Sequence, residues 1–180
     1  MDLALYFVTS LPALAIGETP PFGLSEFRRK CDGVLSKDQL NALDALLSGT
    51  ENEDPFVSAY LARETQLRNV AGRLRAAAWG GDVRFSARMY SGYDVTFAKK
   101  ISEAFTKTSP LEKEMEIDRA RFWMADELAG FGEFTAAHAY AYAVKLRICE
   151  RWAQMTEEKG KEAIEKVIND NDPDSKQDFS

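Results

Sequence analysis

The side chain with the widest catalytic use occurs once in this chain, as His138 between Ala137 and Ala139. Histidine is the usual proton shuttle and metal ligand near neutral pH. A single histidine excludes the paired Glu-x-x-His motif of di-iron bundles and the ligand spacing of zinc sites. No glycine-rich phosphate loop occurs either. We therefore predict no cofactor, no metal and no enzyme. The remaining catalytic alternative combines Tyr140, His138 and a carboxylate.

Carboxylates recur at every second position in one stretch. They are Glu112, Glu114, Glu116 and Asp118. A step of two scatters side chains around a helix and does not gather them on one face. We predict a solvated face, with the first acids favoured by the helix dipole.

Arginines recur along residues 63–88 of a chain whose net charge is −6. They are Arg63, Arg68, Arg75, Arg84 and Arg88. Such a patch suits an acidic partner or RNA. The alternative is pairing within the chain, with Glu51, Glu53 and Glu64 as the acceptors. We place partner contacts on these arginines.

Composition limits the function classes further. The 180 residues are 45% hydrophobic, which predicts a folded globular protein. The acidic balance argues against broad phosphate-backbone binding, so we expect no nucleic acid. Cys31 and Cys149 are expected to be reduced core residues, which suits the cytoplasm. The many tryptophans and tyrosines mostly predict core, although an apolar patch used for a partner or for a homodimer remains open.

The N-terminal run lacks the marks of a secretion signal, because Asp2 carries the wrong charge and Thr9, Ser10 and Pro12 interrupt the apolar stretch. No stretch approaches the roughly 20 apolar residues of a membrane span. We therefore predict a cytoplasmic chain that reaches a membrane only through other proteins.

The central element that must position these arginines is a helix over residues 54–81. Asp54 caps it, Pro55 suits its first turn, and Gly80-Gly81 ends it. Its predicted apolar stripe is Phe56, Tyr60, Leu67, Val70, Ala71, Leu74 and Ala78. Gly72 predicts a close helix crossing.

Capping residues predict where the other helices begin. Ser25 is expected to cap a helix burying Phe27, Cys31, Val34 and Leu35, and Ser36 to Gln39 form a capping box for a helix ending at Gly49. Further helices are predicted over 95–107, from Ser109-Pro110 to Gly130, from Thr135 to before Gly160, and over 163–168. Residues 3–8 form a strand or a helical turn, and residues 82–93 a loop with one helical turn.

The prediction is thus an all-α fold of six to seven helices in two halves, 1–81 and 82–169, followed by a disordered acidic tail at 170–180.

Two blocks of this chain resemble a known family. The opening YFVTSLPAL (6–14), Pro20-Pro21 and the stretch from Glu26-Phe27 to Cys31 form the first block. Asp118-Arg119, Phe122-Trp123, AYAVKLRICERW (141–152) and Glu158-Lys159-Gly160 form the second. Both resemble a small bacterial family of uncharacterised proteins encoded beside V-type ATP synthase genes.

That family in turn resembles a reduced form of the C-type stalk subunit of V-type ATP synthases, which is also named d. Asn69 followed by Arg75-Ala76 is similar to the repeated Asn-(five residues)-Arg-Ala helix of that stalk protein, although Thr65 and Gln66 replace the acidic residues that usually precede it. The resemblance implies a non-catalytic central-stalk adaptor, which joins the motor's central shaft to the membrane rotor ring and transmits torque. The resemblance also implies that Asn69 belongs, with the arginines, to the residues that contact the partner. The alternative is a helical regulatory or RNA- or protein-binding module without a motor role.

Overall fold

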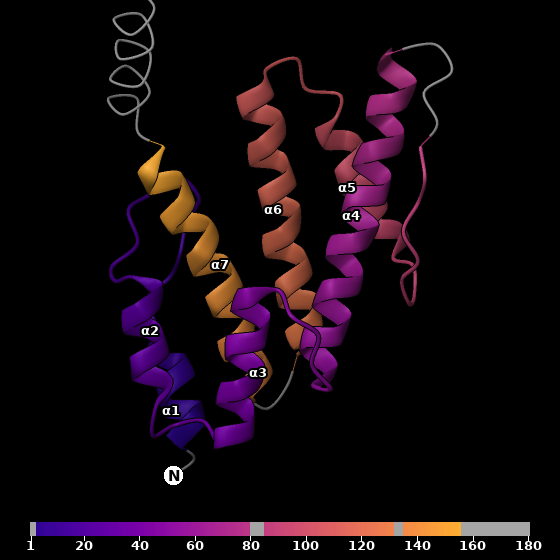
Figure 1. Cartoon of the computed structure of the whole chain (residues 1–180). Helices are drawn as coiled ribbons and strands as arrows, with labels where there is room; N and C mark the ends of the chain where they lie inside the picture. Colours follow the sequence, from indigo (N-terminus) through magenta and orange to yellow (C-terminus); the bar gives the residue numbers. More distant parts are fainter. Residues whose placement is uncertain (1–2, 80–84, 132–134, 156–180) are drawn as a thin grey trace, which may run out of the picture.

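The structure is a computed structural model that describes residues 3–79, 85–131 and 135–155. Within these ranges the chain forms seven α-helices and no β-strand beyond an isolated bridge between Asp32 and Leu35 (Figure 1). The predicted all-α fold is confirmed. The predicted helix over 163–168, the acidic tail at 170–180 and Arg84 lie outside the described residues.

The N-terminal helices are α1 (Leu3–Thr9), α2 (Leu24–Cys31) and α3 (Lys37–Ser48). Ser36 and Gln39 form the predicted capping box of α3, and Gly49 ends this helix in a left-handed conformation with φ of 73°. The predicted cap at Ser25 is wrong, because Gly23 precedes α2 and Ser25 lies within it. The helix also stops at Cys31, so Val34 lies in the following turn and is only half-buried.

The central helix α4 (Pro55–Trp79) begins where predicted, with the Asp54 carboxylate accepting from the amides of Phe56 and Val57 at 2.9 and 3.2 Å. Its stripe is buried from Phe56 to Ala71. Beyond Ala71 the helix extends past the core, so Leu74 is half-buried and Ala78 is exposed, contrary to the prediction.

Gly72 does permit a close approach, but by an aromatic ring and not by a helix. A Cβ atom at this position would lie 2.2 Å from Cε2 of Phe85, a side chain of the segment after α4. That segment, residues 85–94, forms neither helix nor strand and bends at Ser91 before Gly92, whose φ is 71°, so the helical turn predicted there is wrong for its described part.

The C-terminal helices are α5 (Val95–Ala104), α6 (Pro110–Ala129) and α7 (Ala136–Gln154). The side chains of Asp94 and Ser109 cap α5 and α6 as predicted, and Gly130 ends α6. Helix α5 ends three residues earlier than expected, and α7 ends at Gln154.

Helix α7 packs against α1, α2 and α3 as well as α6, while α4 packs against α3, α5 and α6. Figure 1 shows α7 between the N-terminal helices and α6. One buried core therefore contains residues such as Phe27, Phe56, Phe97 and Tyr140 from both predicted halves. The division into 1–81, 82–169 and 170–180 stays a prediction. In the described part of the chain, no helix has the length and apolar character to cross a membrane.

Candidate partner-binding surface

The predicted arginines do not share one environment. Arg63 is half-buried and its Nε lies 3.8 Å from the Asp94 carboxylate. Arg68 and Arg75 are exposed on α4, and Arg88 is exposed on the segment 85–94. Because Arg68 and Arg75 are seven residues apart, they lie on nearly the same side of α4.

These exposed arginines have no ion pair among the described residues. Arg75 instead lies over the ring of Phe105, with 5.7 Å between its guanidinium carbon and the ring centroid. Among the described residues, the alternative of internal pairing with Glu51, Glu53 and Glu64 does not occur, since Glu64 pairs with Arg121 of α6 and Arg63 lies near Asp94. The guanidinium groups of Arg68, Arg75 and Arg88 are thus left on the surface.

Asn69 differs from the arginines because its side chain is buried, with 2% of its surface exposed. Its Nδ2 donates to the Arg88 carbonyl at 2.8 Å, and its Oδ1 accepts from the Arg88 amide at 2.9 Å. Asn69 therefore fixes the segment 85–94 to α4 and is not itself open to a partner.

Gln66, one turn earlier on α4 and fully buried, makes the same kind of contact. Its Nε2 donates to the Asp94 carbonyl at 2.6 Å, and its Oε1 accepts from the Asp94 amide at 3.0 Å. An ionised carboxylate accepts but does not donate, so it would leave the Asp94 carbonyl unsatisfied, whereas the amide of Gln66 satisfies both backbone groups. Together Gln66 and Asn69 attach the segment at two points, which sequence reasoning missed. The sequence signal that could have indicated these contacts was the presence of two amide side chains, Gln66 and Asn69, within the apolar stripe of α4.

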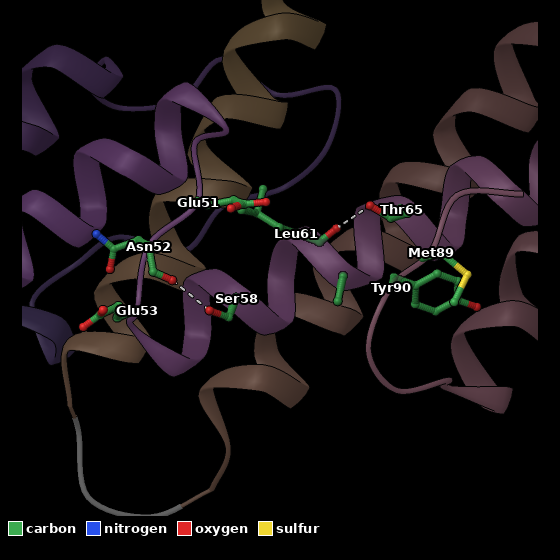
Figure 2. Close-up of a pocket in the computed structure, with 9 residues that line it drawn as sticks. Glu51, Asn52, Glu53, Ser58, Leu61, Thr65, Met89 and Tyr90 are labelled. Atoms are coloured by element: carbon green, nitrogen blue, oxygen red, sulfur yellow. Dashed lines mark hydrogen bonds between the residues drawn. The ribbon is translucent and has the colours of Figure 1, made fainter.

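An open groove of about 560 Å³ lies between this segment and the turn that precedes α4. Figure 2 shows Glu51, Asn52 and Glu53 at one end and Met89 and Tyr90 at the other. Between them, four residues of α4 line the groove: Ser58, Leu61, Ala62 and Thr65. We call this cavity the Met89 groove.

A second, smaller cavity adjoins the Met89 groove. It contains Arg68 and Arg147, and it shares Glu51, Leu61 and Thr65 with the Met89 groove. The two cavities thus form a continuous surface along α4, acidic near its N-terminal end and basic from Arg68 onward.

A buried ion-pair network between α4, α6 and α7 escaped sequence analysis. Arg121 binds Glu64 through two bonds of 2.8 and 3.1 Å and Asp118 at 2.9 Å. The other Asp118 oxygen accepts from Arg151 and from Trp152 Nε1, the latter at 2.6 Å. These contacts raise the pKa of Arg121, despite its burial, and keep its charge.

Asp118 corrects the prediction of a solvated acidic face, because its side chain has no exposed surface. The carboxylates four residues apart on α6, Glu114 and Asp118, both reach Arg151 of α7. Glu114 and Asp118, two of the four acids, therefore form ion pairs with the same arginine of α7. Glu116 instead forms a surface ion pair with Arg119 on the same helix.

The residues considered for catalysis bind different backbone groups. The Tyr140 hydroxyl donates to the Gln39 carbonyl at 3.0 Å, and His138 Nδ1 accepts from the Thr135 amide at 3.2 Å. His138 is half-buried near the start of α7. That the chain is not an enzyme stays a prediction.

Both cysteines are buried thiols, as expected. Burial raises the pKa of Cys31 to about 12 and also raises the pKa of Cys149. Across residues 3–79, 85–131 and 135–155, no three His, Cys, Asp or Glu side chains are grouped so that they would hold a metal ion.

Residues 86–173, just under half of the chain, match the profile of a family described as "Protein of unknown function (DUF2764)". The match begins within the segment 85–94 and contains α5, α6 and α7. No curated protein matches this chain. No solved structure matches it either.

Proposed function

We propose that this protein is a non-catalytic, central-stalk adaptor of a V-type ATP synthase. In this role it links the shaft of the soluble motor to the membrane rotor ring, from the cytoplasmic face and through protein contacts alone. The proposal takes its partners from the resemblance to a reduced C-type stalk protein.

The supporting observation is the surface of α4. Arg68 and Arg75 are exposed on one side of this helix, and no carboxylate of the described residues neutralises them. Unpaired arginines on a protein of net charge −6 suit a partner with acidic groups. The all-α fold agrees with a helical stalk protein, although fold alone does not establish a role.

The test is charge reversal at this surface. The variant Arg68→Glu/Arg75→Glu and the control Arg29→Glu/Arg73→Glu change the net charge equally, and all four side chains are exposed. Arg73 lies two residues from Arg75 and therefore on a different side of α4. Each tagged protein is purified from its own cells in mild detergent, and its circular dichroism is compared with the wild type.

We expect motor and rotor-ring proteins to accompany the wild type and the control in equal yield. Their yield with Arg68→Glu/Arg75→Glu should fall at least about fivefold, because like charges across an interface raise dissociation. Unchanged yield with that variant removes the arginine surface from the proposal. Nucleic acid in place of the motor proteins, released steeply by salt, favours the RNA-binding alternative.

A further inference from the structure

The Met89 groove has an apolar wall that the fold holds open to solvent. Met89 has 96% of its surface exposed, although its neighbour Arg88 is bound to Asn69 through two backbone hydrogen bonds. Gln66 fixes the other end of the segment at Asp94. A partner that contacts Met89 therefore meets a backbone already ordered, which lowers the entropic cost of binding. Methionine also adapts its shape to different apolar side chains.

The opposite end of the groove is acidic, and its acids are not needed for the fold of α4. Glu51 and Glu53 are exposed, and neither forms an ion pair among the described residues. The first amides of α4 are already capped by Asp54. The two glutamates thus leave two negative charges beside an apolar floor formed by Leu61 and Ala62.

From this arrangement we infer that the Met89 groove binds a partner-protein segment in which an apolar side chain is followed closely by lysine or arginine. The apolar side chain enters between Leu61 and Met89, and the basic residue pairs with Glu51 or Glu53. This inference rests on the proposed function in one respect, that the partner belongs to the stalk or the rotor ring.

The charge order along α4 fixes the direction of that segment. The acids lie before Pro55 and the exposed arginines begin at Arg68, about 20 Å farther along the helix at 1.5 Å per residue. A partner segment therefore carries its basic residues toward Glu51 and its acidic residues toward Arg68. Reversed polarity would place like charges together at both ends.

The experiment cross-links the groove in the full-length protein in its own cells. The photoreactive amino acid p-benzoylphenylalanine replaces Tyr90, which lines the groove, or Tyr6, an exposed aromatic residue on α1, as the matched control. Cross-linked peptides are identified by mass spectrometry. The same cross-link is repeated in the variant Glu51→Lys/Glu53→Lys and in the control Glu18→Lys/Glu127→Lys. The control changes the net charge by the same amount, at two exposed glutamates outside the groove.

We expect position 90, and not position 6, to capture a peptide with an apolar residue beside lysine or arginine. Its yield should fall at least about fivefold with Glu51→Lys/Glu53→Lys, because like charges would then face each other across the interface, and stay unchanged with the control. Capture of a segment without basic residues, or a yield insensitive to Glu51→Lys/Glu53→Lys, overturns the inference.

The outcome also separates this inference from the proposed function. A captured basic segment that belongs to a protein outside the motor supports the groove chemistry and refutes the stalk role. Co-purification of the motor proteins without any cross-link at position 90 supports the stalk role and refutes the inference about the Met89 groove. If neither is found, both fail.

Discussion

Replacing Asp118 by alanine tests how much the buried network between α6 and α7 stabilises the fold. The carboxylate is fully buried and accepts from Arg121, Arg151 and Trp152. Its removal leaves the Trp152 N–H buried without an acceptor and takes one carboxylate from each arginine. Removing one partner of a buried ion pair costs about 3–5 kcal/mol. That is a large share of the roughly 5–15 kcal/mol by which a domain is stable.

The assay is unfolding by heat and by urea, followed by circular dichroism. For a protein of this length, about 2–4 °C of Tm is lost per kcal/mol, so Asp118→Ala should lower Tm by roughly 6–20 °C. Glu116→Ala is the matched control, because Glu116 lies on the same helix and its pair with Arg119 is at the surface. That variant should cost about 0–1 kcal/mol. An equal, small loss for both variants would refute the role given to the Asp118 network.

Three other predictions concern individual side chains. Asn69→Asp keeps the acceptor but loses the donor to the Arg88 carbonyl, so the free energy of unfolding should fall by about 1–3 kcal/mol and protease cleavage within residues 85–93 should accelerate. Gly72→Ala should destabilise the protein by displacing the Phe85 ring, whereas in a Phe85→Ala background the same change should stabilise α4 by about 1 kcal/mol; stabilisation in both backgrounds would contradict the contact. Burial raises the pKa of Cys31 and Tyr60 to about 12, so the folded state holds their protons more tightly than the unfolded state. Their contribution to stability is full below about pH 9 and is lost as the pH rises toward 12, and a urea midpoint that stays constant over this range would contradict it.

Local signals predicted the helix boundaries well where a cap and its helix are adjacent in sequence. Ser36 with Gln39, and Ser109 before Pro110, satisfy amides within three residues, so no other part of the chain needs to be known. The prediction at Ser25 failed because Gly23 and the Glu150 carboxylate, which accepts from the Leu24 amide at 2.8 Å, set the start of α2. Glu150 is 126 positions away, and no local pattern indicates it.

The candidate site was predicted only in part for the same reason. Exposure of Arg68 and Arg75 follows from their place outside the apolar stripe of α4. The burial of Asp118 does not follow from its neighbours, since its partners Arg151 and Trp152 are 33 and 34 positions away on α7. Asn69 was placed among the partner-binding residues, whereas its amide is used by the chain's own segment. Contacts with other parts of the chain decide whether these polar side chains are buried, and the helical period of the sequence does not predict those contacts.

The measurement that tests the central claim most directly is the mass of the native complex that contains this chain. The tagged protein is released from its own membranes in mild detergent and examined intact by native mass spectrometry. The stalk role predicts one assembly in which this chain is present in fixed stoichiometry with the soluble motor proteins and the rotor ring. The chain alone, a homodimer, or a complex with nucleic acid or an unrelated protein would contradict it.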